Sequence, residues 1–330
     1  MSFLVRRVVF YLAALWAAIT FDFALPRLMP GDPAENIYIQ NRALFAGNPQ
    51  VSLDAIRDML GLSHDPMLAQ YWHYLVNLAH GNLGVSISRF PEPVTQVIRD
   101  NLPWTLFLVG LATLIAFVLG TALGMICAWH RGGILDELLM PLTAVASSFP
   151  VFFLALVLLS WVTLEPHAWF PTGANYSSPD VPNLSPGFIG NMLYHTALPA
   201  FTLVVISLGG WLFGMRNAMI NTLSEDYVTM ATAKGLRDRR VMFAYAARNA
   251  VLPQVTGFAM ALGSIVGGTF IIELVFNYQG IGFYMIQAVN SQDYPLVQGL
   301  LLMITLCVLL ANFAVDLLYG RLDPRVRTTS

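Results

Sequence analysis

Long apolar stretches separated by shorter polar ones make up most of this 330-residue chain. A helix needs about 20 mostly apolar residues to cross a lipid bilayer. Six stretches reach that length, at residues 8–28, 102–129, 138–164, 192–215, 251–276 and 295–319. The pattern therefore predicts an all-α integral membrane protein with six transmembrane helices. Arg6 and Arg7 precede the first stretch as they would in a secretory signal, but no small-residue cleavage site follows it, so we expect an uncleaved helix.

The composition agrees with a membrane protein. Hydrophobic residues make up 56% of the chain and charged residues only 11%, whereas roughly a quarter of the residues in soluble domains are charged. Both cysteines lie inside apolar stretches, where we expect small packing residues rather than a disulfide framework. Two pairs of glycines four positions apart, Gly120 with Gly124 and Gly263 with Gly267, predict close approaches between helices.

The basic residues predict the orientation, because cytoplasmic loops carry an excess of Lys and Arg. With the N-terminus inside, most of the 17 basic residues face the cytoplasm. They are Arg6, Arg7, Arg131, Arg216, Lys234, Arg237, Arg239, Arg240, Arg248, Arg321, Arg325 and Arg327. We therefore expect both termini in the cytoplasm. The chain then divides into a first transmembrane helix at 1–28, an extracytoplasmic loop or cap at 29–101, and a five-helix core at 102–330 with a cytoplasmic loop at 216–252.

The long extracytoplasmic loop between the first two helices contains a predicted amphipathic helix. Asp65 and Pro66 form its start, an N-cap followed by proline at the first helical position. Its apolar stripe and two neighbouring tyrosines are Leu68, Tyr71, Trp72, Tyr74, Leu75 and Leu78. This helix either lies on the outer membrane face or packs on the transmembrane helices as a small cap. A second outer loop at 166–187 is rich in Pro, Gly and Ser, which predicts irregular structure.

No constellation of catalytic or metal-binding residues emerges from the sequence. The six histidines show no zinc-type pairing. The phosphate-binding pattern G-x-x-x-x-G-K-[ST] is missing, and the only lysine, Lys234, stands between alanine and glycine. This chain is therefore not expected to be an enzyme, nor to bind a metal or ATP by itself. ATP-driven transport would need a separate ATPase subunit.

Ionisable residues at membrane depth are costly and are functional candidates by default. Asp22, Glu273 and Asp316 each lie near the end of a predicted transmembrane helix. Each is either a contact on a transport pathway or a polar helix end that is hydrogen-bonded to a neighbour. None lies near the bilayer midplane, where a proton relay would be expected, and this speaks against proton coupling.

The stretch YVTMATAKGLRDRRVMFAYAARNAVLP, residues 227–253, gathers much of the positive charge. Ser224 is the predicted N-cap of a first helix, and Gly235 is placed to end that helix in a left-handed conformation. A second helix is expected between Gly235 and Pro253. Two short helices broken at a glycine would form a protruding elbow with small apolar residues at its tip. The charge pattern alone fits a partner-docking surface and an ordinary cytoplasmic loop equally well.

Two motifs in this stretch, ATAKGL at 231–236 and RNAVLP at 248–253, resemble the EAA loop of ABC importer permeases, in particular the oligopeptide and dipeptide (Opp/Dpp-type) branch. Thr229 and Met230 stand where the general motif has Glu and Ala, and the interval from glycine to proline is longer; both departures resemble the peptide branch. In this family the loop forms a coupling helix that docks in a groove of the nucleotide-binding subunit. The resemblance assigns this contact to Thr229, Met230, Ala231, Ala233, Lys234, Gly235, Leu236, Arg239 and Arg240.

Further motifs extend the resemblance along the chain in the family's order. They are LPRLMPGDP at 25–33, QYW at 70–72, HGNLGVS at 80–86, LPA at 198–200, ELVF and GIG within 273–282, DYP at 293–295, DLLY at 316–319 and LDPR at 322–325. In the segment 273–282, Gln279 replaces a proline of the family's signature. The candidates for the transport pathway or its gate are Asp22, Glu273, Phe276, Gly280, Gly282 and Asp316.

The resemblance implies a permease subunit of a bacterial ABC importer in the cytoplasmic (inner) membrane. The implied partners are a second, homologous permease, two ABC ATPase subunits, an extracytoplasmic substrate-binding protein and membrane lipid, with no nucleic acid. ATP and Mg²⁺ would bind to the ATPase subunits, and no cofactor to this chain. Short peptides are the first expected cargo, with oligosaccharides and then nickel as alternatives. A proton-coupled secondary transporter and an assembly scaffold without transport are the rivals from other classes.

Overall fold

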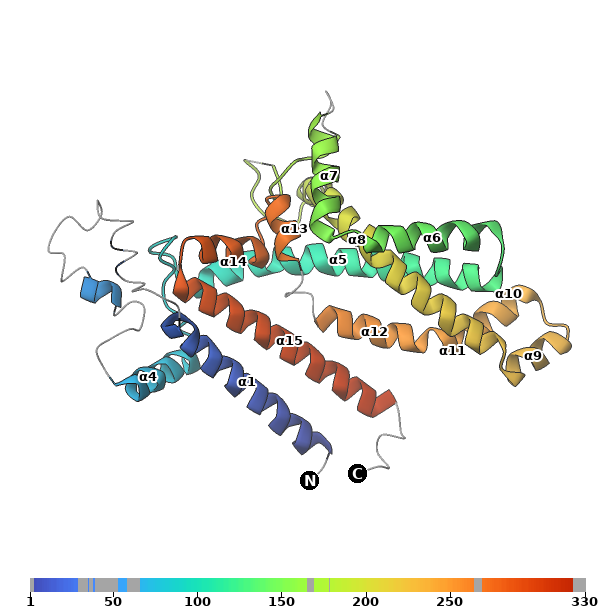
Figure 1. Cartoon of the computed structure of the whole chain (residues 1–330), viewed down its shortest axis with the longest axis horizontal. Helices are drawn as coiled ribbons and strands as arrows, with labels where there is room; N and C mark the ends of the chain where they lie inside the picture. The colour runs from blue at the N-terminus through green and yellow to red at the C-terminus, as the bar shows by residue number, and fades with distance from the viewer. Residues whose placement is uncertain are drawn as a thin grey trace. The chain divides into compact units, whose positions relative to one another are not determined.

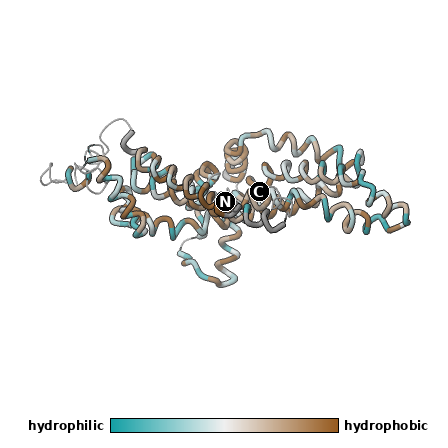
Figure 2. The backbone as a smooth tube through the Cα atoms, turned by 90° about the horizontal axis from the view of Figure 1, so that it is seen from below, coloured by the Kyte–Doolittle hydropathy of each residue, from teal (hydrophilic) through white to brown (hydrophobic). Residues whose placement is uncertain are grey.

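The computed structural model describes residues 3–28, 35, 38, 53–57, 66–164, 169–177, 179–263 and 269–322. Within these ranges the chain is mostly helical (Figure 1), which confirms the all-α prediction. The helices are α1 (Phe3–Leu28), α4 (Met67–Ala79), α5 (Val94–Trp129), α6 (Ile134–Ser148), α7 (Val151–Leu164), α8 (Pro186–Leu223), α9 (Asp226–Ala233), α10 (Asp238–Arg240), η1 (Val241–Ala247), α11 (Arg248–Ala250), α12 (Leu252–Gly263), α13 (Phe270–Val275), α14 (Ile281–Asn290) and α15 (Tyr294–Leu322). Hydrophobic positions run along much of the helical backbone (Figure 2).

Four helices, α1, α5, α8 and α15, are long and apolar enough to cross a membrane. The helices α6 and α7 pass the same test only as a bent pair, so the described residues hold up to five candidate spans. The first, second, fourth and sixth predicted stretches lie within the four long helices. The fifth, 251–276, contains α12 and α13, and its middle lies outside the described residues.

The prediction of one continuous helix at 138–164 is wrong. The helix α6 ends at Ser148, α7 begins at Val151, and the two are bent by 98°. Phe149, the C-cap of α6, has an extended backbone with φ −76° and ψ 136°. The ring of the following Pro150 disfavours helical geometry in the residue before it. Hydropathy misses this break because it weighs apolar content and not backbone geometry.

The helices α5 and α8 extend beyond the predicted stretches. The helix α5 begins at Val94, and α8 covers Pro186–Leu223. At the start of α8, the Ser185 Oγ accepts a hydrogen bond from the Phe188 N–H at 3.3 Å, and Pro186 occupies the first helical turn. Hydropathy indicates where a helix enters the bilayer and not where the helix ends, so it does not predict these polar turns.

The chain divides into two compact units, residues 1–103 with 280–330 and residues 104–279. In the first unit α1 and α15 lie side by side (Figure 1). The rings of Tyr11 and Phe313 meet edge to face at 5.4 Å. These units follow packing, whereas the division at residues 28 and 101 made from the sequence follows membrane topology and stays a prediction.

The helix α4 packs against α1 in the first unit. The ring of Phe23 on α1 lies 5.0 Å from that of Tyr71 and 5.7 Å from that of Tyr74. Trp72, by contrast, is 66% exposed. The tyrosine face of α4 thus follows the packed alternative of the sequence analysis. The predicted helix start at Asp65 lies outside the described residues.

A buried carboxylate joins a loop at 84–94 to the start of α15 in the first unit. The Asp293 Oδ2 accepts hydrogen bonds from the hydroxyls of Ser86 at 2.5 Å and Ser88 at 2.7 Å, and from the Ser88 N–H at 2.9 Å. The Asp293 Oδ1 caps α15 by accepting from the Leu296 N–H at 3.2 Å. The motifs HGNLGVS and DYP, 207 positions apart at Ser86 and Asp293, therefore meet in one contact.

Gly120 and Gly124 let α5 approach α8 closely in the second unit, as predicted. A Cβ on Gly120 would lie 2.6 Å from the Trp211 Cβ, and one on Gly124 would lie 2.4 Å from the Leu212 carbonyl oxygen. No side chain fits at such distances, so the two helices meet backbone to backbone. The second predicted pair includes Gly267, which lies outside the described residues.

We expect Gly124→Ala to destabilise the protein and Gly110→Ala, on the same helix, to leave it stable. A Cβ on Gly110 meets nothing within 4 Å, so that substitution gains about 1 kcal/mol of helix propensity. At Gly124 the new methyl group must displace the α8 backbone, which costs about 1–3 kcal/mol. Thermal unfolding in detergent measures both, and equal shifts in the two variants would contradict the close packing.

Candidate coupling surface

The elbow predicted from the sequence is a set of short helices in the second unit. We define it as residues 224–250, which hold α9, α10, η1 and α11 (Figure 1). The prediction of Ser224 as the N-cap of its first helix is wrong, because α9 follows Glu225 without a side-chain cap. Ser224 instead caps the end of α8, where its Oγ donates to the Asn221 carbonyl oxygen at 2.7 Å. The long helix α8 reaches the elbow and uses this serine for its own last turn.

The helix α9 ends in a Schellman motif at Gly235. The glycine has φ 72°, and its N–H donates to the Thr232 carbonyl oxygen at 2.9 Å. The Leu236 N–H donates to the Ala231 carbonyl oxygen at 3.4 Å. This geometry confirms the predicted helix break. A Cβ on Gly235 would meet nothing within 4 Å, so the space in front of the turn is open.

The second arm of the elbow contains a π-helical turn, η1. Its buried side chains are five positions apart, Val241 with Ala246 and Met242 with Ala247. The i→i+5 hydrogen bonds of a π-helix widen the turn, so that residues five apart share one face. The sequence analysis expected an ordinary helix here, and no residue type marks the π turn in advance.

An apolar cluster fastens the elbow to the ends of α5 and α8. Met215 and Met219 of α8 and Ala128 of α5 are buried in it. The elbow contributes Val228, Ala231, Val241, Met242, Ala246, Ala247 and Ala250. The Asn249 Nδ2 donates to the Tyr227 hydroxyl at 2.7 Å, which ties α11 to α9. The two arms therefore form one body with the helix ends that they cover.

The residues that the resemblance assigns to coupling fall into two groups. The exposed group is Thr229, Met230, Ala233, Lys234, Gly235, Arg239 and Arg240. Ala231 is only 3% exposed and lies in the apolar cluster, and the half-buried Leu236 packs against that cluster. The expectation that Ala231 lies at the exposed tip is therefore wrong, because its side of α9 faces the protein's own core. Contact with an ATPase stays a prediction for the exposed group.

A bidentate ion pair links α6 to α8 beside the elbow. The Arg216 Nε and Nη2 donate to the Asp136 Oδ1 and Oδ2 at 2.6 and 2.8 Å. The Gly132 N–H donates to the same carboxylate at 3.1 Å, and Asp136 is only 5% exposed. Sequence reasoning missed this pair. The signal that could have found it is a carboxylate just before one predicted span and an arginine just after another, both on the same predicted side.

The pathway candidates are divided between the two units, and each group is described within its own unit. In the second unit Glu273 and Phe276 are buried, and Glu273 accepts a hydrogen bond from the Thr105 Oγ1 at 2.8 Å. Burial raises the pKa of the neighbouring Tyr278 to about 12, so its hydroxyl stays neutral. That hydroxyl lies 3.4 Å from the Thr196 Oγ1.

The other pathway candidates belong to the first unit. Gly280 is the N-cap of α14, and Gly282 lies in its first turn. Asp22 is 4% exposed, and its Oδ2 has no hydrogen-bond partner within the described ranges. Asp316 forms an ion pair with Arg7, which matches the alternative of a polar helix end bonded to a neighbour. A transport role for these residues stays a prediction.

Comparison with known proteins adds an independent observation. Residues 120–328 match the family described as binding-protein-dependent transport system inner membrane component, and residues 1–109 match the N-terminal region of such membrane components. A putative peptide permease protein of Brucella suis is 36% identical over 335 residues, with both chains fully covered. The di/tripeptide permease DppB of Pseudomonas aeruginosa is 35% identical over 340 residues, and the dipeptide permease DppB of Escherichia coli K12 is 32% identical over 349 residues. In both cases 99% of each chain is covered.

We expect Arg216→Met to destabilise the protein more than Asp136→Asn. Without the arginine, the buried Asp136 carboxylate keeps its hydrogen bond from the Gly132 N–H but loses the positive charge that compensates it. We expect the free energy of unfolding to fall by about 3 kcal/mol or more. Without the aspartate, the Arg216 side chain, which is 19% exposed, still reaches water, and the loss is about 1 kcal/mol. Thermal unfolding midpoints in detergent give the order, and the reverse order would contradict a structural role for the pair.

Proposed function

The chain belongs to the family of binding-protein-dependent transport system inner membrane components, and from this we propose that it is the permease subunit of an ATP-driven importer of short peptides. The observation that carries the proposal is its end-to-end similarity to relatives that are named as peptide permeases. The membership and the long apolar helices make it a multi-pass protein of the inner membrane. It is a transport component of the membrane.

The proposed topology has six membrane crossings, both termini in the cytoplasm and the long loop at 29–101 outside. The distribution of arginine along the chain supports this orientation. In it, α6 and α7 together provide the third crossing, and the segment from α12 to α13 provides the fifth. The elbow then lies in the cytoplasm, where an ATPase subunit can reach it.

The proposed partners are a second, homologous permease, two ABC ATPase subunits and an extracytoplasmic substrate-binding protein. ATP and Mg²⁺ bind to the ATPase subunits in this proposal. Its support is that the relatives are named as parts of transport systems, and that the family is defined by dependence on a binding protein.

The elbow is the part of the chain suited to receive movement from an ATPase. A partner that presses on the exposed Met230 and Lys234 displaces α9. The apolar cluster passes the displacement to Met215 and so to α8, and the Arg216–Asp136 pair passes it on to α6. A push at the elbow therefore acts on several helices of the second unit at once. Import follows if the two resulting states differ in their affinity for cargo.

A bulky residue at the helix break tests the docking. We expect Gly235→Trp to abolish both co-purification of the ATPase and ATP-dependent uptake, because the indole fills the open space in front of the turn. Gly235→Asn should keep both, since asparagine is smaller and tolerates positive φ.

Gly81→Trp is the matched control. Gly81 also has φ 72° and nothing within 4 Å of an added Cβ, so the backbone strain is the same. It follows α4 in the first unit, and we expect the ATPase to remain bound. Wild-type recovery of the ATPase with Gly235→Trp would show that the elbow is not the docking surface.

Uptake by the whole transporter in proteoliposomes tests the cargo. With the substrate-binding protein present, we expect labelled di- and tripeptides to accumulate only when ATP is supplied, and at the same rate after the proton gradient is collapsed. Uptake of an oligosaccharide or of nickel in place of peptides would refute the cargo. Uptake that follows the proton gradient without an ATPase would refute the importer itself.

A further inference from the structure

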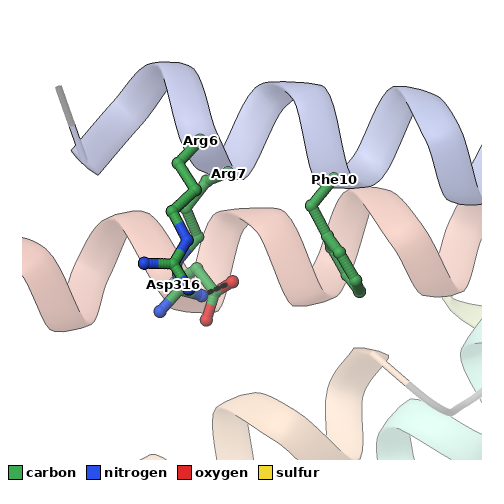
Figure 3. A pocket seen from close by; sticks show the side chains of 4 residues that line it. All are labelled: Arg6, Arg7, Phe10 and Asp316. Carbon is green, nitrogen blue, oxygen red and sulfur yellow. Dashed lines mark ion pairs between the residues drawn. The ribbon is translucent and has the colours of Figure 1, made fainter. Parts of the chain in front are cut away.

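A pocket opens between the beginning of α1 and the end of α15 in the first unit (Figure 3). Its volume is about 430 Å³, and it is lined by Arg6, Arg7, Phe10 and Asp316. The two arginines and the aspartate lie close together, and Phe10 stands one helical turn further along α1 (Figure 3). The pocket thus combines two guanidinium groups, one carboxylate and an aromatic ring.

The pocket carries an excess of positive charge. Asp316 is paired with Arg7 and also accepts a hydrogen bond from the Tyr11 hydroxyl at 2.7 Å. Arg6 is exposed and makes no ion pair within the part of the chain that the structure describes. Its guanidinium group can therefore form a bidentate, charge-assisted contact with a phosphate.

An exposed apolar line continues from the pocket along α1. Phe10 and Phe21 are 65% and 62% exposed, and the small, exposed Ala13 and Ala17 lie between them on the same side of the helix. The spacing of three and four residues keeps these positions in one row. The rise from Phe10 to Phe21 is about 16 Å, close to half of the roughly 30 Å hydrocarbon core of a bilayer. The row therefore matches the depth of one leaflet.

We propose that the pocket binds the phosphate headgroup of an anionic phospholipid in the cytoplasmic leaflet, with one acyl chain along the row from Phe10 to Phe21. Arg6 is the main phosphate contact, and the Arg7–Asp316 pair forms the floor of the pocket. The continuous apolar row favours a lipid over a free phosphate ion, which would use only the charged end. Basic pockets at the cytoplasmic ends of transmembrane helices suit such headgroups. The proposal rests on the proposed orientation, which places the start of α1 in the cytoplasm.

Native mass spectrometry of the assembled transporter tests this site. The complex is reconstituted in nanodiscs of equal phosphatidylglycerol and phosphatidylcholine, and the lipids that remain bound after gentle release are counted. We expect an enrichment of phosphatidylglycerol of about fivefold or more, and its loss in Arg6→Gln, because a charge-assisted phosphate contact is removed. Arg99→Gln is the matched control, since Arg99 is also exposed and makes no ion pair with a described residue. It should retain the enrichment.

Phe10→Ala separates the apolar part of the site from the charged part. We expect it to lower bound phosphatidylglycerol about threefold, because part of the apolar contact is lost. In the wild type, we expect about 50 mM inorganic phosphate to leave the bound phosphatidylglycerol unchanged. Displacement by inorganic phosphate would overturn the proposal in favour of a plain anion site. No enrichment in the wild-type complex, or full enrichment in Arg6→Gln, would also overturn it. Bound lipid is measured without transport, so a failed uptake experiment with enrichment intact counts against the proposed function and not against this site.

Discussion

A carboxylate that is taken out of water must be paired or hydrogen-bonded, because an isolated buried charge costs several kcal/mol. Three of the buried carboxylates meet this requirement by joining segments that are distant in sequence. Asp293 joins the loop after α4 to α15, Glu273 joins α13 to α5, and Asp136 joins α6 to α8. In lipid, apolar burial discriminates little between neighbouring helices, because lipid tails are as apolar as the side chains. These polar contacts therefore specify which helix ends meet. Asp22 departs from the rule within the described residues, which keeps it a pathway candidate.

Much of the helical content could be predicted from the sequence, because the bilayer imposes a minimum apolar length on a crossing helix. The ends of α5 and α8 could not, since polar turns continue both helices beyond the apolar stretch. The break at Pro150 was open to prediction from backbone sterics but not from hydropathy. Predictions that depend on the backbone of a single glycine agreed with the structure. Gly235 ends α9 and Gly124 allows close packing, because each outcome depends on the missing Cβ at that position.

The sequence predicted which segment of the chain forms the candidate site, but not how its side chains pack or pair. Motifs located the elbow, but they could not show that Arg216 would find Asp136, 80 positions away, or that η1 would wind as a π-helix. A charged residue does not reveal its partner when that partner lies on another helix. The pairing of helix ends depends on packing over the whole unit, so it became visible only in three dimensions.

The two alanines of the Ala-x-Ala pair in α9 serve different surfaces. Positions two apart on an α-helix lie about 200° apart around its axis, so Ala231 and Ala233 cannot face the same partner. Ala231 lets α9 lie close to the buried methionines of α8, which a larger side chain would have to displace. Ala233 is exposed, and its small side chain leaves the surface beside Lys234 and Gly235 open. If an ATPase subunit docks on the elbow as proposed, this short motif places one small residue against the protein's own core and another on the docking surface.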